Sequence, residues 1–227
     1  MAIATSVKLY ELAGESDSYR FSPYCWRARL ALAHKGIDVE TVPWRFTEKD
    51  AIAFSGQGQV PVLVDGDRTV IDSWAIAEYL DDAYPENSVL GNGTTQALCY
   101  FVKCWDETVL QRYLGPLILL NVYEHLHPKD KDYFRGSREA KIGQSLEEFS
   151  VDLEAKLDAF RKVLSPLRRT VMNQPFIAGT APKFADHIVM GRLQMARVVS
   201  PLPPLAEDDP IFEWQERMIE RYPVLRL

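Results

Sequence analysis

Cysteine and histidine are scarce in this sequence, and long apolar runs are absent. Three cysteines and four histidines are spread over 227 residues, which is too few and too irregular for a disulfide framework or a tetrahedral metal site. No run approaches the ~20 consecutive apolar residues of a transmembrane helix, and the first residues lack the apolar core of a signal peptide. We therefore expect a cytoplasmic protein with no metal site and no membrane partner.

Positive charge is also in short supply. The chain carries 26 Lys and Arg against 32 Asp and Glu, a net charge of −6, which argues against a nucleic-acid partner because nucleic acid attracts a basic face. The imbalance is confined to residues 1–86, which hold 8 basic and 14 acidic side chains, whereas residues 87–227 hold 18 of each. Since domains typically hold ~100–200 residues, we expect two domains, 1–86 and 87–227.

The first domain has the pattern of an α/β fold. Short apolar segments are typical of strands at 7–12, 37–42, 60–64 and 69–71. A helix is expected to begin at Pro23 with Ser22 as its N-cap and to end at Gly36. A second helix is expected after Asp72 and Ser73, and a short one at 47–55. The order is a βαβ unit, a hairpin and a helix.

The second domain is expected to be entirely helical. An apolar stripe at 98–113 predicts a helix that Gly115 and Pro116 should kink or interrupt. A stripe at 142–164 predicts one long amphipathic helix. Two more helices are expected at 184–199 and 211–221, and the charged run 129–138 has the composition of a solvated loop.

The sequence Phe-Ser-Pro-Tyr-Cys-Trp at 21–26 is where we expect the chemistry. A redox motif of this form has a second thiol in place of Ser22, at a helix start whose dipole stabilises a thiolate. A serine hydroxyl is not acidic enough to be that nucleophile, but it can donate a hydrogen bond to a thiolate. The reactive sulfur is therefore expected to come from a ligand.

Four motifs together resemble the cytosolic glutathione transferases. They are Ser-Pro-Tyr-Cys at 22–25, Gln-Val-Pro-Val-Leu at 59–63, Asp-Gly at 65–66, and Asp-Ser-Trp-Ala-Ile-Ala-Glu-Tyr-Leu at 72–80, followed by the helical half. The runs 22–29 and 72–81 are most similar to the serine-type, etherase-related transferases of bacteria and fungi. The resemblance implies a thioredoxin-like domain that binds glutathione, an all-α domain that forms most of the electrophile site, and a homodimer.

The resemblance also implies roles for matched residues. Ser22 would donate its hydroxyl to the glutathione sulfur. Pro61 would be a cis-proline that exposes the Val60 backbone to the cysteinyl part of the ligand. Ser73 would bind the γ-glutamyl carboxylate, and Asp72 the neighbouring ammonium group.

Several of these positions have a second interpretation. Gln59 matches a position that touches the tripeptide only in some classes. Ser22 is also a good N-cap without any chemistry. Cys25 is more typical of a small buried side chain than of a redox partner, and Tyr10 more typical of a strand core than of an alternative activator of the thiol.

The electrophile pocket is the least defined part of the site. The aromatic residues Trp105, Tyr113 and Tyr123 are candidates to line it, although each could equally belong to helix packing. The family often has Ser or Thr three residues before Asp at the start of a buried helix, whereas Lys183 stands in that place before Asp186.

The expected function is a transferase that directs the glutathione thiolate at a hydrophobic, aromatic electrophile. A narrower form is cleavage of aryl ethers. The alternatives are a dimer that binds glutathione and hydrophobic ligands without catalysis, and thiol–disulfide exchange through Cys25.

Overall fold

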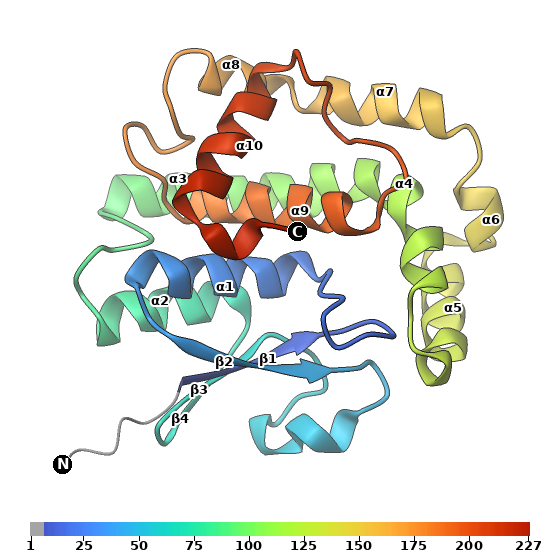
Figure 1. The fold of residues 1–227 in the computed structure, drawn as a ribbon, viewed down its shortest axis with the longest axis horizontal. Helices are drawn as coiled ribbons and strands as arrows, with labels where there is room; N and C mark the ends of the chain where they lie inside the picture. The colour runs from blue at the N-terminus through green and yellow to red at the C-terminus, as the bar shows by residue number, and fades with distance from the viewer. Residues whose placement is uncertain (1–6) are drawn as a thin grey trace.

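The computed structural model describes residues 7–227, in which a small sheet is covered by helices (Figure 1). Its four strands are β1 (Val7–Leu12), β2 (Val39–Trp44), β3 (Val62–Asp65) and β4 (Arg68–Ile71). They lie in the order β2-β1-β3-β4; β1 pairs parallel with β2, and the other pairs are antiparallel. The α/β class is confirmed. The strands expected at 37–42 and 60–64 each begin two residues later.

Helices lie on one face of this sheet. They are α1 (Pro23–Lys35) and α2 (Ser73–Ala83). The short 3-10 helix η1 (Lys49–Ser55) lies on the opposite face of the sheet (Figure 1). Helix α1 starts and ends where the sequence predicts. Ser22 is its N-cap, Pro23 is its first residue, and Gly36 closes it with a φ of 69°, a conformation that suits glycine.

The rest of the chain is helical, as expected. Its elements are α3 (Gly93–Trp105), the π-helical turn η2 (Asp106–Leu110), α4 (Gln111–Glu124), α5 (Pro128–Ile142), α6 (Leu146–Phe149), α7 (Leu153–Val163), α8 (Ser165–Val171), α9 (Phe184–Val199), α10 (Pro210–Arg221) and the 3-10 turn η3 (Pro223–Leu225). Helix α9 is buried at nearly every position. None of the helices in this described part of the chain has the length and apolar character to cross a bilayer.

Two expectations for the helical half are wrong. The stripe at 142–164 is not one helix, because the backbone turns left-handed at Gly143 (φ 77°) and at Asp152 (φ 53°). The charged run 129–138 belongs to helix α5 rather than to a loop. Pro116 lies inside α4 and does not interrupt the helix, and a π-helical turn precedes α4.

Helix α9 lies directly on α1 (Figure 1). The close approach occurs at Gly191, where an added Cβ would stand 2.7 Å from the carbonyl oxygen of Pro23. At the start of α9, Asp186 accepts hydrogen bonds from the backbone N–H of Lys183 (3.0 Å) and of Ile177 (2.7 Å). The Lys183 ammonium group donates to the Ser88 carbonyl instead of capping the helix.

Candidate functional site

Sheet register brings three segments together at one edge. Tyr10 of β1 lies opposite Val62 of β3, and Val62 lies opposite Ile71 of β4. The end of β1, the 59–61 segment before β3, and the start of α2 after β4 therefore meet at this edge. Helix α1 also begins there, because the crossover between the parallel strands β1 and β2 must start where β1 ends. The candidate glutathione residues thus share one edge of the sheet.

Ser22 lies at the amino-terminal end of α1 and is 6% exposed. Its Oγ accepts a long hydrogen bond from the Cys25 backbone N–H, at 3.4 Å. Ser22 is thus the N-cap of α1, as the sequence predicts. Accepting this bond occupies one lone pair and leaves the hydroxyl proton free to donate, so the capping geometry does not remove the capacity to bind a thiolate.

Ser73 and Asp72 begin helix α2 at the same edge. The Oγ of Ser73 is buried and has no hydrogen-bond partner within residues 7–227. Oδ1 of Asp72 caps the helix by accepting from the N–H groups of Trp74 (2.8 Å) and Ala75 (3.2 Å). Asp72 has a φ of 74°, a strained conformation of the kind found at functional sites. An unpartnered buried hydroxyl beside a helix start fits the carboxylate expected there.

The segment before β3 has the geometry that the motif implies. The Val60–Pro61 peptide bond is cis. Pro61 is buried, whereas the Gln59 side chain is exposed. Val60 is half-buried and lies two positions before Val62, the first residue of β3.

Two alternatives for the reactive group are placed in packing roles. Cys25 is buried in the core, and burial raises the pKa of its thiol to about 12, which opposes formation of a thiolate. Tyr10 points to the sheet face opposite α1, where its ring centroid lies 5.4 Å from that of Phe54 in η1. These arrangements are consistent with the packing roles that the sequence favours for both residues.

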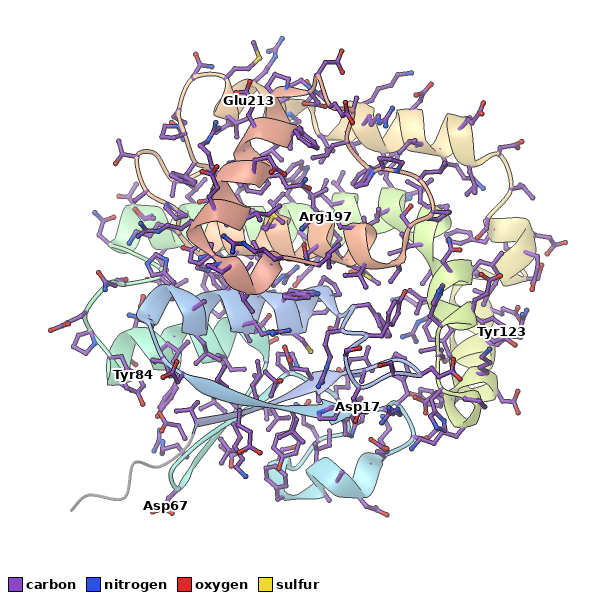
Figure 2. All side chains as sticks on the ribbon, in the orientation of Figure 1. Asp17, Asp67, Tyr84, Tyr123, Arg197 and Glu213 are labelled. Carbon is purple, nitrogen blue, oxygen red and sulfur yellow. The ribbon has the colours of Figure 1, made fainter. Side chains whose placement is uncertain are left out.

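The three aromatic candidates for the electrophile pocket are not gathered at one place. Trp105 is partly buried against the core, and Tyr113 is 39% exposed. Tyr123 packs under the guanidinium group of Arg135 in α5, 4.3 Å from its ring centroid, and lies near the edge of the molecule in Figure 2. The ten residues between Tyr113 and Tyr123 correspond to ~15 Å of helix.

Tyr24, two residues after Ser22, makes contacts that sequence reasoning missed. Its hydroxyl donates to Oε1 of Gln111 in α4 at 3.0 Å. The guanidinium carbon of Arg27 lies 4.5 Å from its ring centroid. Tyr24 therefore joins the first turn of α1 to the first turn of α4. Its place in the Ser-Pro-Tyr-Cys motif was the available signal.

A buried ionic cluster supports this junction. Asp106, in the π-helical turn, accepts from Arg27 of α1 and from Arg192 of α9, with Arg192 Nε 2.8 Å from Oδ1 and Nη2 2.7 Å from Oδ2. Burial lowers the pKa of Arg27, although Asp106 partly offsets this effect. No local sequence signal pairs these residues, which lie 79 and 86 positions apart. The cluster fixes the start of α1 against two helices.

Within residues 7–227, no group of three or more His, Cys, Asp or Glu side chains is placed to hold a metal ion.

Comparison with known proteins identifies the family. The model described as "Glutathione S-transferase, N-terminal domain" matches residues 18–88, and "Glutathione S-transferase, C-terminal domain" matches residues 97–222. The chain belongs to the glutathione S-transferase family. This membership confirms the superfamily and the thioredoxin-like and helical halves that the motifs implied. It leaves the serine-type, etherase-related assignment open.

Individual relatives agree with the family. The chain is 42% identical over 145 residues to Glutathione S-transferase Z1 of Arabidopsis thaliana, covering 61% of this chain and 66% of that one. It is 34% identical over 94 residues to the maleylacetoacetate isomerase of Pseudomonas aeruginosa, covering 38% and 41%. These matches span less than two thirds of either relative.

The similarity in fold extends over nearly the whole chain. A glutathione S-transferase from Ceriporiopsis subvermispora, solved in complex with glutathione, superimposes with a TM-score of 0.83 at 21% identity and covers 98% of both chains. At this identity the similarity establishes the fold of this family member.

Proposed function

We propose that this family member activates the thiol of glutathione with Ser22 and transfers glutathione to a hydrophobic, aromatic electrophile. One observation carries the proposal. Two helix starts meet at one sheet edge, the first with the Ser22 hydroxyl and the second with the buried, unpartnered hydroxyl of Ser73. The first is suited to a thiolate and the second to a carboxylate, and glutathione carries both groups.

In the proposed mechanism, Ser22 acts on the sulfur. A free thiol has a pKa of ~8.5 and is mostly protonated at neutral pH. The Ser22 O–H and the positive end of α1 stabilise the thiolate relative to the thiol. The thiolate then forms a C–S bond at the electrophilic carbon, and the leaving group departs with the electron pair of the bond that breaks.

The remaining matched residues would hold the tripeptide. The Ser73 hydroxyl and backbone N–H would bind the γ-glutamyl carboxylate. The second carboxylate oxygen of Asp72, which is not used in capping α2, would face the ammonium group. The Val60 backbone would pair with the cysteinyl part of the ligand, beside Gln59 and Pro61.

Replacement of Ser22 by Ala tests the role of the hydroxyl. Turnover with an activated aryl chloride should fall by roughly 100-fold, whereas the dissociation constant for glutathione should change by only a few-fold. Ser145→Ala is the matched control, because Ser145 is also a serine N-cap but begins the remote helix α6. Unchanged turnover in Ser22→Ala would transfer the role to Tyr10 or Cys25.

Cleavage of aryl ethers is the narrower form of this proposal. The runs 22–29 and 72–81 support it through their resemblance to etherase-related transferases. The thiolate would displace a phenolate from a β-aryl ether. Release of a phenol from a model ether would establish this activity, and conjugation of aryl chlorides without ether cleavage would count against it.

A second candidate is glutathione-dependent isomerisation. It is favoured by the similarity to a protein named maleylacetoacetate isomerase and to Glutathione S-transferase Z1. Reversible addition of the thiolate to an activated cis double bond would allow rotation before glutathione leaves. Conversion of a maleyl compound to its trans isomer without net consumption of glutathione would distinguish this activity from conjugation.

We also infer that the chain forms a homodimer. Helix α3 exposes two consecutive aromatic side chains, Tyr100 (54% exposed) and Phe101 (69%), which is a surface suited to a partner.

A dimer that binds glutathione and apolar ligands without catalysis remains the alternative to an enzyme. Tight binding of apolar ligands with no turnover over a broad panel of electrophiles would favour it.

A further inference from the structure

The turn between β2 and η1, residues 45–48, lies at the edge of the sheet that carries the candidate site. Strand β2 ends at Trp44, which pairs with Leu12 at the end of β1. Because these two strands are parallel, the segments that follow them leave from the same edge. In Figure 1, helix α5 stands beside this edge. The 45–48 turn is therefore placed to connect the site with α5.

Asp130 of α5 attaches this turn to the helical half. Its side chain is fully buried. Oδ2 accepts from the Phe46 N–H at 2.9 Å, and Oδ1 accepts from the Thr47 N–H at 3.0 Å and from the Thr47 hydroxyl at 2.7 Å. Hydrogen bonds to a carboxylate are stronger than those between neutral groups. One carboxylate thus holds both backbone amides at the centre of the turn.

A second link between α5 and the turn is exposed to solvent. Lys129 Nζ lies 2.6 Å from Glu48 Oε1, and the two side chains are 40% and 29% exposed. Ion pairs of exposed side chains contribute little to stability, because water and salt screen them. The attachment of the turn to α5 therefore depends mainly on Asp130.

Contacts inside the turn tie its two ends together. Glu48 Oε2 accepts from the Arg45 N–H at 2.9 Å, and the Glu48 carbonyl oxygen accepts from the Trp44 indole N–H at 2.7 Å. A displacement at Thr47 is therefore transmitted along the turn. The first residue that it reaches beyond the turn is Lys49, at the start of η1.

Lys49 extends this connection to the 59–61 segment. Its ammonium group donates to the Gly58 carbonyl oxygen at 2.5 Å. A Cβ at Gly58 would stand 3.1 Å from Cδ of Lys49, so the two residues are in close contact. Gly58 precedes Val60 by two positions, and the Val60 backbone is the group proposed to pair with the cysteinyl part of glutathione. Asp130 is thus connected to this backbone through the turn and Lys49.

We propose that Asp130 is a positioning residue for glutathione. Through the 45–48 turn and Lys49, it holds the Val60 backbone where it can pair with the ligand. Asp130 acts without contacting glutathione, because its carboxylate is buried against the turn. The inference rests on the proposed function, since it requires glutathione to bind at Val60. By reciprocity, bound glutathione should stabilise the contacts of Asp130 with the turn.

Ser22 is fixed independently of this connection. It is the N-cap of α1, and α1 is held by the ionic cluster of Arg27, Asp106 and Arg192. Loss of the Asp130 contacts should therefore weaken glutathione binding more than it slows the reaction of bound glutathione. A general loss of structure would instead lower both.

Asp130→Asn tests the role with little change in side-chain shape. Asparagine keeps one acceptor oxygen but turns an NH2 group towards a backbone N–H of the turn. By titration calorimetry, glutathione should bind this variant roughly tenfold more weakly. The KM for glutathione should rise by a similar factor, whereas kcat with an aryl chloride should change by less than about twofold.

Two further variants bracket this substitution. Asp132→Asn makes the same change at an exposed residue of α5 and should leave the dissociation constant and kcat unchanged. Thr47→Val removes only the bond from the Thr47 hydroxyl to Asp130. It should weaken glutathione binding by a few-fold, and it tests the proposal even if Asp130→Asn does not fold.

Hydrogen exchange of the ligand-free protein measures the connection itself. Asp130→Asn should speed exchange of the amides in residues 45–60 by roughly tenfold, and Asp132→Asn should not. A double-mutant cycle with Lys49→Met adds a second measurement. Because both side chains act through one connection, the double variant should lose less affinity than the product of the two single losses.

Three results would overturn the role of Asp130 while leaving the proposed function intact. They are unchanged glutathione affinity in both Asp130→Asn and Thr47→Val, equal losses of affinity and kcat, and single losses that simply multiply in the double variant. A wild-type protein that binds no glutathione would instead refute the proposed function, and this inference with it.

Discussion

At the residue scale, the most unusual feature of the sheet is the carboxyl group of Glu11. It lies in β1, is fully buried, and neither carboxylate oxygen has a hydrogen-bond partner within residues 7–227. Burial raises its pKa from 4.5 to about 7, and the charges of Arg29 and Arg20 only partly oppose this effect. The folded protein therefore binds a proton at Glu11 over a pH range in which the unfolded chain has released it.

The stability of the protein should consequently depend on this carboxyl group. Because the folded-state pKa is the higher one, the free energy of unfolding should fall as pH rises from about 4.5 to about 7, by ~3 kcal/mol in total. Denaturant unfolding of wild type and Glu11→Gln across this range measures the difference, since glutamine does not titrate. Glu15→Gln, at an exposed carboxylate in the next loop, is the control. Parallel curves for wild type and Glu11→Gln would contradict the account.

At the element scale, the fit between α1 and α9 depends on one missing side chain. A Cβ at Gly191 would stand 2.7 Å from the Pro23 carbonyl oxygen and 3.3 Å from Cγ of Arg27. Gly191→Ala should lower the free energy of unfolding by ~1–3 kcal/mol, because the backbone oxygen cannot move without shifting α1.

A second glycine provides the control for this substitution. Gly136 lies in helix α5, and a Cβ there would meet nothing within 4 Å. Gly136→Ala should therefore raise the free energy of unfolding by up to ~1 kcal/mol, because alanine is the better helix former. If both substitutions stabilise the protein, the close approach of α9 to α1 does not exist in solution.

Local signals predict the elements that begin the candidate site. Ser22, Pro23 and Gly36 mark the ends of α1 because capping depends on a few neighbouring residues. The apolar stripe at 142–164 wrongly predicts one continuous helix, because side-chain periodicity does not reveal a left-handed backbone at Gly143 or Asp152.

Contacts between distant segments explain the remaining errors. Asp130 attaches the charged run 129–138 to the first domain, because its buried carboxylate accepts from the N–H groups of Phe46 (2.9 Å) and Thr47 (3.0 Å). The hydrogen bond between Tyr24 and Gln111 likewise joins segments far apart in the sequence. The motif positions at 59–61 and 72–73 could be found from the sequence, since each lies within a short run.

At the scale of the whole molecule, the inferred homodimer makes a direct prediction. Light scattering after gel filtration should give about twice the chain mass of 25.9 kDa. Phe101→Glu should shift the protein towards the monomer, because it places a charge in the middle of the exposed aromatic pair on α3. Met172→Glu changes another exposed apolar side chain (66% exposed) and should leave the mass unchanged. A wild-type mass of a single chain would refute the dimer.

The folded protein is proposed to lower the pKa of the thiol of bound glutathione. Ser22 and the start of α1 would both contribute, and each unit of lowering corresponds to ~1.4 kcal/mol of preference for the thiolate. The most direct measurement is titration of glutathione bound to wild type and to Ser22→Ala, followed by the ultraviolet absorbance of the thiolate. Bound to wild type, the thiol should titrate well below its ordinary pKa of ~8.5, and Ser22→Ala should return it by about one unit or more towards that value. An identical pKa in both proteins would contradict the assignment of Ser22.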